Sequence, residues 1–214
     1  LPGNTAAAVN KDLDYVKAKI GEEYFIFAES KLEVIKNLSK DKQVELVSEL
    51  KGSDLVGKKY KPIFDYFTNE ENGWKVCAAP YVTAETGTGI VHLAPGYGEE
   101  DMALAKEKNI PFVMHVGPDG KFTAEVTDFA GEKAKPKEDH QAGDVLIIKN
   151  LAHRNILFAK EKIIHSYPHC FRCETPLYYF AIPAWFIKIS EVKDKMLALN
   201  KKINWVPEHL KFGR

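Results

Sequence analysis

The sequence predicts an α+β fold that is mainly β, with a β-barrel core decorated by short helices. Short segments rich in aromatic and β-branched residues dominate the first half, turn residues separate them, and few segments show helical periodicity. A doubly wound parallel sheet would instead alternate its strands with helices. The chain has 214 residues, of which 45% are hydrophobic, so it can form one domain with an appendage and a sizeable core.

The first half of the chain is predicted to contain five strands and one helix. Alternation of apolar and polar residues, or enrichment in residues that suit a pleated surface, supports these strands. The expected strands cover residues 14–20, 23–28, 42–50, 74–79 and 89–93. Ser30 and Glu33 have the spacing of a capping box, which predicts a short helix that ends near Asn37.

The second half is predicted to contain longer helices. Apolar residues at helical spacing indicate helices over residues 98–108 and 144–153. A buried strand is expected at residues 111–114, with a turn after it at residues 118–120. The polar and charged residues 131–141 predict an exposed loop.

The chain changes character near Ser166. A strand is expected to begin at residues 163–164, and another is expected at residues 183–189. Ser190 is expected to cap a helix that ends near Leu199.

Five aromatic side chains in this part admit two interpretations. They could stack nucleobases, as in proteins that bind single strands. Burial in a core or between domains is the favoured prediction, because strands use aromatic residues for packing. The residues concerned are Tyr178, Tyr179, Phe180, Trp185 and Phe186.

Charge and targeting signals narrow the class of protein. The 30 basic and 30 acidic side chains cancel, which argues against gripping long nucleic acid through phosphate contacts alone. No apolar run reaches the roughly 18 residues of a membrane span, and the first residues do not resemble a signal peptide. The chain has no initiator Met and is interpreted as an excised fragment. Three cysteines do not make a disulfide framework, so we expect a reducing, cytoplasmic location.

The most informative segment runs from Gly87 to Asp101. Its glycines let the backbone approach a ligand closely, and a helix beginning at Gly98 would present free N–H groups. The spacing fits neither a Walker loop nor a dinucleotide-binding fingerprint. From spacing alone, Asp101 is readily explained as a first-turn acid that complements the helix dipole. His92 is likewise readily explained as a hydrogen-bonded histidine of a strand.

This segment resembles the editing insertion, or CP1 domain, of class I aminoacyl-tRNA synthetases for branched aliphatic amino acids. The match covers Gly87-Thr-Gly-Ile-Val-His-Leu-Ala-Pro95 and the Gly98-Glu-Glu-Asp101 that follows. Residues 1–9, 167–177 and 205–214 are similar to the isoleucyl form, so the resemblance extends over essentially the whole chain. The valyl and leucyl sibling enzymes remain an alternative.

The resemblance implies a proofreading hydrolase. A pocket gains only about 1–3 kcal/mol from one methylene group, a range for which isoleucyl-tRNA synthetase is itself a standard example. A second site would therefore hydrolyse valine from the 3′-terminal adenosine of tRNA(Ile), and valyl-adenylate is a further candidate substrate. Residues 1–165 would form the editing core, and residues 166–214 a β-rich return segment toward the catalytic domain. A noncatalytic tRNA-positioning module is the alternative from another functional class.

The resemblance also implies roles for particular residues. Asp101 would capture the α-ammonium group, and His92 would contact the terminal ribose and limit side-chain size. Asn4 would contribute a polar contact to substrate hydroxyl groups. The substrate-binding wall would include Leu1, Thr88, Gly89, Ile90 and Val91.

In this family a threonine-rich strand precedes the position of Leu1 and helps to hold substrate and water. That strand is absent from the 214 residues, so we expect full hydrolytic activity to require it.

Cofactors and further partners follow from the same resemblance. The parent synthetase would use ATP and Mg²⁺ to ligate isoleucine in a catalytic domain outside this chain, and neither of its ATP-site signatures is present here. No cofactor is expected in the editing domain, and no membrane partner. Cys170 and Cys173 have metal-ligand spacing but provide only half of a tetrahedral site, so zinc would need ligands outside the chain. A pair of reduced thiols and a small zinc-binding adaptor are the alternatives.

Overall fold

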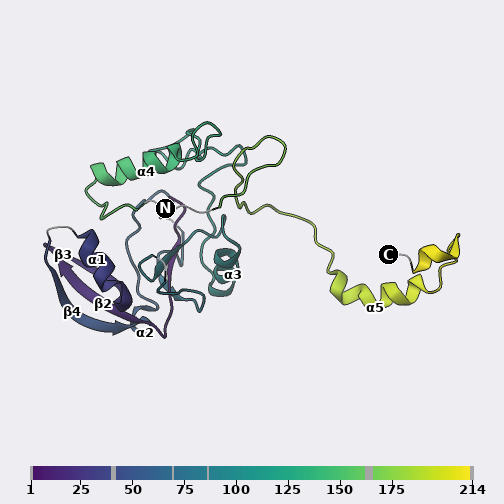
Figure 1. Cartoon of the computed structure of the whole chain (residues 1–214), viewed down its shortest axis with the longest axis horizontal. Helices are drawn as coiled ribbons and strands as arrows, with labels where there is room; N and C mark the ends of the chain where they lie inside the picture. The colour runs from purple at the N-terminus through teal and green to yellow at the C-terminus, as the bar shows by residue number, and fades with distance from the viewer. Residues whose placement is uncertain (1, 40–41, 69, 86, 162–165, 213–214) are drawn as a thin grey trace. The chain divides into compact units, whose positions relative to one another are not determined.

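The computed structural model describes residues 2–39, 42–68, 70–85, 87–161 and 166–212 (Figure 1). The chain divides into two compact units, Leu1–Ala181 and Ile182–Arg214. In the described residues, the first unit contains six strands and four α-helices, and the second contains one α-helix. The predicted boundary between residues 165 and 166 stays a prediction.

The strands and helices are short throughout the described residues. The strands are β1 (Ala6–Val9), β2 (Asp14–Ile20), β3 (Glu23–Ala28), β4 (Val44–Lys51), β5 (Val76–Ala78) and β6 (Ile90–Leu93). The α-helices are α1 (Leu32–Leu38), α2 (Gly52–Leu55), α3 (Glu99–Lys108), α4 (Ala142–His153) and α5 (Ile189–Asn200). Two 3₁₀ turns are η1 (Glu29–Lys31) and η2 (Glu208–Lys211). Small sheets with short helices confirm the predicted α+β class, and closure into a barrel stays a prediction.

One sheet has the strand order β3-β2-β4, and both pairings are antiparallel. All three of its strands are predicted by the sequence. The register shifts between Lys17 and Ala18, where the pairing with β4 is irregular. Helix α1 lies against this sheet (Figure 1), and its Ile35 joins the apolar cluster around Val16 and Phe27.

The helix α1 confirms a predicted helix but not its predicted cap. Ser30 lies within η1, and Lys31 occupies the N-cap position without a side-chain hydrogen bond. The capping-box prediction is therefore wrong, because the 3₁₀ turn moves the helix start past Ser30.

The second sheet has the order β5-β1-β6, with β1 parallel to β5 and antiparallel to β6. Strands β5 and β6 are predicted by the sequence, whereas β1 is not. The alanine-rich segment Ala6–Val9 has little intrinsic strand preference. Its burial explains the strand: Ala6, Ala8 and Leu93 are 0% exposed and pack with Leu104 of α3.

The predicted helix over residues 98–108 is confirmed by α3. Gly98 is its N-cap, and Asn109 ends it in the left-handed conformation with φ 52°. The strand predicted at residues 111–114 is wrong, because this segment has no strand pairing in the structure. An isolated bridge joins Val116 to Phe122 instead, across the predicted turn.

The remaining predictions for the first unit concern α4 and the loop before it. Helix α4 confirms the helix predicted over residues 144–153, and its Leu151 packs into a cluster with Phe64 and Phe129. The predicted loop over residues 131–141 is confirmed and is mostly exposed. The strand expected to begin at residues 163–164 lies outside the described residues.

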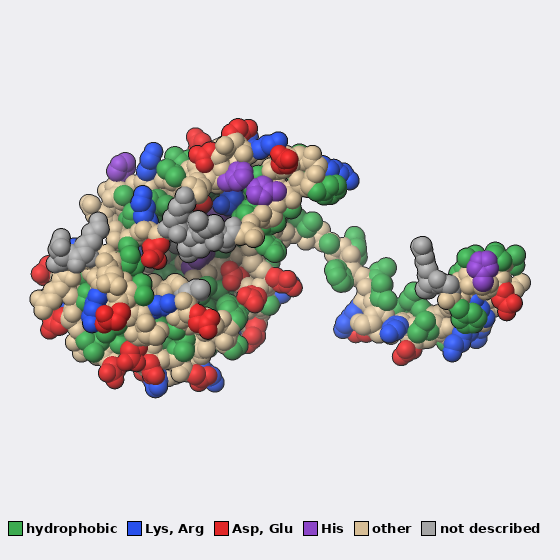
Figure 2. Space-filling view, in the orientation of Figure 1, with side chains coloured by type: hydrophobic (Ala, Val, Ile, Leu, Met, Phe, Trp, Pro, Cys, Tyr) green, Lys and Arg blue, Asp and Glu red, His purple; other side chains and the backbone are tan. Residues whose placement is uncertain are grey.

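The second unit departs from its prediction at residues 183–189. This segment forms no strand pairing, so the predicted strand is wrong. A strand needs an adjacent strand to accept its backbone hydrogen bonds, and none is present in the described part of this unit. Trp185 is fully exposed and Phe186 is 93% exposed, so these two side chains are not buried in a core of the described residues, and their burial against another domain stays a prediction. The space-filling view shows hydrophobic side chains on the surface of the molecule (Figure 2). Helix α5 is confirmed, but Lys188 and not Ser190 is its N-cap.

No helix in the described residues has the length and apolar character needed to cross a membrane.

Candidate functional site

The connection from β6 to α3 positions the two strongest candidate residues. His92 lies in β6 directly opposite Ala7 of β1. The chain then turns through residues 94–98 and enters α3, where Asp101 lies in the first turn with Glu99 and Glu100. The tightly packed sheet and helix therefore fix the spacing between His92 and Asp101.

Asp101 has a clear structural function. Its Oδ2 accepts a hydrogen bond of 2.9 Å from the backbone N–H of Ala94. A Cβ atom added at Gly98 would lie only 3.2 Å from the same carboxylate, so the helix start is packed closely around it. Asp101 thus joins the end of β6 to the start of α3. A carboxylate has about four acceptor positions, so this bond leaves capacity for a cation.

His92 lines a cavity of about 300 Å³. The His92 residue is partly exposed to solvent. The protein atoms around the ring nevertheless remove part of its hydration, which disfavours the charged form and lowers the pKa of His92 to about 4. The negative charge of Asp101 acts in the opposite direction and is the weaker effect. The other lining residues are Pro2, Ala94, Tyr97, His115, Val116, Phe122, Ala134, Lys135, Asp144, Ile147, Tyr167, Tyr178 and Tyr179.

His115 is a second histidine of this cavity, and sequence reasoning missed it. Its Nδ1 is buried and has no hydrogen-bond partner in the described part of the chain. The ring contacts Tyr97 edge-on with centroids 4.3 Å apart, and a Cβ atom at Gly3 would lie only 2.0 Å from Nδ1. Burial lowers the pKa of His115 to about 3. No spacing signal marks this residue, because it lies between elements and not within a periodic segment.

Asn4 is engaged inside the protein. Its Oδ1 accepts a hydrogen bond of 2.6 Å from the Tyr60 hydroxyl, and its Nδ2 donates to the carbonyl of Ala6 at 2.7 Å. The indole N–H of Trp74 donates to the Asn4 carbonyl at 3.2 Å. Neither Asn4 nor Asp101 is among the described residues that line the cavity that contains His92; Asp101 is connected to this cavity only through its hydrogen bond to Ala94. The structure therefore does not bring all three predicted catalytic residues to one surface.

Four of the five predicted substrate-binding residues lie immediately before and within β6, outside the lining of the His92 cavity. Gly89 is buried, has φ +77°, and accepts a hydrogen bond of 2.8 Å from the Tyr15 hydroxyl. Thr88 accepts a bond from the Ala28 N–H through its carbonyl, and Ile90 packs in the adjacent apolar cluster. Val91 is partly exposed at 39%. Leu1 lies outside the described residues.

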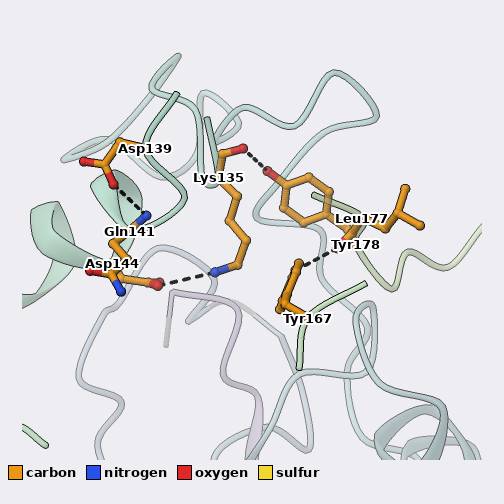
Figure 3. Close-up of polar contacts among 7 residues, drawn as sticks. All are labelled: Lys135, Asp139, Gln141, Asp144, Tyr167, Leu177 and Tyr178. Atoms are coloured by element: carbon orange, nitrogen blue, oxygen red, sulfur yellow. Dashed lines mark hydrogen bonds and ion pairs between the residues drawn. The ribbon is translucent and has the colours of Figure 1, made fainter. Parts of the chain in front are cut away.

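A lysine and two tyrosines form another side of the cavity, and Figure 3 shows the polar contacts around them. The Lys135 ammonium lies 3.3 Å from a carboxylate oxygen of Asp144 and 5.3 Å from the ring centroid of Tyr167. The Tyr178 hydroxyl donates to the Lys135 carbonyl at 3.5 Å. Lys135 therefore connects the loop before α4 with both ends of the hairpin that contains Tyr167 and Tyr178.

The two cysteines lie in the turn of that hairpin. The Cys170 N–H donates to the carbonyl of Thr175, and the Glu174 N–H donates back to Cys170. The hydrogen bond between the Cys173 sulfur and the Thr175 hydroxyl, 3.1 Å long, is the largest of several effects that lower the pKa of the Cys173 thiol to about 7. Within the described residues, no three Cys, His, Asp or Glu side chains are grouped to hold a metal ion. Zinc binding with ligands from elsewhere stays a prediction.

A comparison with solved structures defines the class of fold. The crystal structure of a leucyl-tRNA synthetase CP1 domain, GlLeuRS-CP1, matches with a TM-score of 0.53. The match covers 78% of this chain and 80% of that chain at 17% sequence identity. The fold is therefore that of a synthetase CP1 domain, which confirms the predicted fold type.

The sequence relatives of this chain are isoleucine–tRNA ligases. The isoleucine–tRNA ligase of Rickettsia bellii is 43% identical over 217 residues, and that of Bdellovibrio bacteriovorus is 40% identical over 218 residues. Both matches cover 100% of this chain. The chain is homologous over its whole length to isoleucyl-tRNA synthetases, as the sequence predicts. It spans only about a fifth of these relatives, 19% and 20% of their lengths. No protein-family model matches the chain.

Proposed function

We propose that this chain is the editing domain of an isoleucyl-tRNA synthetase and hydrolyses valine esterified to tRNA(Ile). One observation carries the proposal: His92 lines a cavity together with Ala94, whose N–H is held by Asp101. The motif that resembles the family is thus one packed unit beside a cavity. Valyl-adenylate is a second substrate within this proposal.

The protein does not need to supply a strong nucleophile, because an aminoacyl ester is already activated toward hydrolysis. Water attacks the ester carbonyl carbon, and the tetrahedral intermediate collapses to valine and a free ribose hydroxyl group. The protein mainly has to hold the ester and the water in reacting geometry. His92 is neutral near pH 7 because its pKa is lowered to about 4, so its ring can accept one hydrogen bond and donate another. We assign it the role of positioning the ribose or the water.

Asp101 recognises the α-ammonium group in this proposal. The free ammonium distinguishes an aminoacyl ester from other esters, and a carboxylate is its natural partner. The bond from Ala94 fixes the carboxylate in place, and the N-terminal end of α3 favours its negative charge. The proposal assigns the limit on side-chain size to His92 and to a wall for which Leu1, Thr88, Gly89, Ile90 and Val91 are the candidates.

The wider partners are also part of the proposal. They are the terminal adenosine of tRNA(Ile), which carries the valine, and the rest of the synthetase, which would ligate isoleucine with ATP and Mg²⁺. Any zinc bound by Cys170 and Cys173 would have ligands outside this chain. The editing reaction itself would need no cofactor and would take place in the cytoplasm.

The test separates the charge of Asp101 from its structural hydrogen bond. Asp101→Asn keeps an oxygen that can accept from Ala94, but it removes the negative charge. Glu100→Gln removes an equal charge from the same helical turn, where the side chain is exposed. We expect Asp101→Asn to reduce valyl-tRNA(Ile) deacylation at least tenfold, whereas Glu100→Gln stays near the parent rate. The tenfold reduction is the effect expected when the substrate ammonium group loses its negatively charged partner.

Two results would count against the proposal. Full activity in Asp101→Asn would eliminate the ammonium-capture role. Absence of any deacylation by the unsubstituted intact protein would instead favour a tRNA-positioning module that lacks catalytic activity.

A further inference from the structure

The cavity beside His92 has a wall that ester hydrolysis does not use. Three tyrosines and a lysine contribute to it: Tyr167, Tyr178, Tyr179 and Lys135. Aromatic faces are the surfaces on which proteins commonly stack nucleobases. Since this wall and His92 line one cavity, a ligand whose ester group meets His92 can extend its nucleoside toward the tyrosines.

Lys135 holds two of these tyrosines in place (Figure 3). Its carbonyl accepts a hydrogen bond from the Tyr178 hydroxyl, and its ammonium lies 5.3 Å from the Tyr167 ring centroid. Asp144 contacts the same ammonium at 3.3 Å. Both rings are therefore connected to one residue before any ligand arrives, Tyr178 through the Lys135 carbonyl and Tyr167 through the Lys135 ammonium. Preorganisation of this kind reduces the entropy that binding would otherwise cost.

The Tyr97 side of the cavity is also fixed. The Tyr97 hydroxyl donates to the Val116 carbonyl at 2.8 Å and accepts from the Val116 N–H at 2.7 Å. The cavity volume of about 300 Å³ lies at the small end of ligand sites. A space of this size suits a single nucleoside and excludes a stretch of paired nucleic acid.

We infer that Tyr178 and Tyr167 bind the terminal adenosine of the aminoacyl-tRNA by contact of their rings with its base. Lys135 is a positioning residue whose ammonium group acts through Tyr167 and whose carbonyl acts through Tyr178. The Tyr178 hydroxyl is directed to Lys135, so recognition of the base depends on the ring and not on the hydroxyl. This inference rests on the proposed function, because it assigns the nucleoside half of the same substrate.

The test measures single-turnover deacylation of valyl-tRNA(Ile) by the intact protein over a range of protein concentrations. Tyr178→Leu keeps apolar bulk over the Gly120 turn, which Tyr178 covers, but it removes the aromatic ring. We expect it to raise the half-saturating concentration about tenfold, as for loss of one base–aromatic stack, with a nearly unchanged maximal rate constant. Tyr178→Phe keeps the ring but loses the hydrogen bond to the Lys135 carbonyl, so we expect a half-saturating concentration between those of the parent and Tyr178→Leu. Tyr24→Ala, at an exposed tyrosine of β3, is the matched control.

Lys135→Met tests the positioning role of the ammonium group, which contacts Tyr167 and Asp144, and it leaves the carbonyl that accepts from Tyr178 in place. We expect it to raise the half-saturating concentration and leave the maximal rate constant unchanged, and we expect Lys135→Arg to restore binding. A purely structural role would instead lower thermal stability without this separation of binding from rate.

The outcomes distinguish the inference from the proposed function. If the parent deacylates normally and Tyr178→Leu has the same half-saturating concentration as the parent, the assigned role of the tyrosines is wrong, but the proposed function stands. If the parent does not deacylate at all, the proposed function fails, and binding of a nonhydrolysable valyl-adenosine analogue becomes the readout. In that case equal affinity of the parent and Tyr178→Leu for the analogue would also refute the binding of the adenosine by these tyrosines.

Discussion

Gly89 is predicted to tolerate no side chain, although its residue type alone does not reveal this. The backbone has φ +77°, and an added Cβ atom would lie 2.5 Å from the Ala28 Cβ. Carbon atoms in contact are normally about 3.5–4.0 Å apart. The segment cannot easily move away, because the Gly89 carbonyl accepts a hydrogen bond from the fully buried Tyr15 side chain.

The expected loss of stability in Gly89→Ala has two parts. A left-handed backbone costs a residue with a Cβ atom roughly 1–2 kcal/mol. Forcing an extra carbon into a packed site adds about 1–3 kcal/mol, so the total is about 2–5 kcal/mol. Gly87 provides a matched control, because it has φ +64° and no atom within 4 Å of an added Cβ. Gly87→Ala should therefore cost only the backbone term, about 1–2 kcal/mol.

Equilibrium urea unfolding of the 214-residue chain measures both variants. The midpoint should fall further for Gly89→Ala than for Gly87→Ala, with unchanged m values. Ala28→Gly removes the contacted carbon, so it should recover part of the loss when combined with Gly89→Ala. Equal losses in the two glycine variants, or additive effects of positions 28 and 89, would refute the close approach of these segments.

Two further predictions concern the neighbouring polar groups. In the folded protein the pKa values of His92 and His115 are lowered to about 4 and about 3. Histidine in an unfolded chain has a pKa near 6.5, so below pH 6.5 the unfolded state binds more protons than the folded state. The thermal midpoint should therefore fall between pH 6.5 and 4, and less steeply in His92→Gln; a midpoint independent of pH would contradict the lowered values. Tyr60→Phe removes the hydrogen bond to Asn4 and should cost about 1 kcal/mol by urea unfolding without slowing deacylation. Slower deacylation with little loss of stability would instead place Asn4 in the reaction.

The sequence predicts most of the regular elements because their local signals are strong. Residues 14–20 alternate clearly, and β2 covers the same residues in the structure. The helix at Gly98 follows from its acidic first turn and apolar spacing. These patterns reflect side-chain burial on one face, which local sequence records.

The failed predictions depend on contacts between distant segments. Strand β1 consists mainly of alanine and exists because β5 and β6 pair on either side of it. The apolar residues 111–114 look like a strand but receive no partner, and the same holds for residues 183–189. Strand pairing is a property of the whole fold, so an apolar run alone does not determine it.

The candidate site was only partly accessible from sequence for the same reason. The motif resemblance selects His92 and Asp101, and the structure adds their packing through Ala94. His115 and Lys135 are far from that motif along the chain and reach the cavity only through folding. Asn4 was selected by resemblance, yet its side chain is directed to Tyr60.

The central claim is that Asp101 binds the ammonium group of an aminoacyl ester beside His92. The most direct measurement is a crystal structure of the intact protein with a nonhydrolysable valyl-adenosine analogue. The account predicts that the analogue occupies the cavity, with its ammonium nitrogen within about 4 Å of the Asp101 carboxylate. An analogue bound away from His92, or an ammonium group turned away from Asp101, would contradict it.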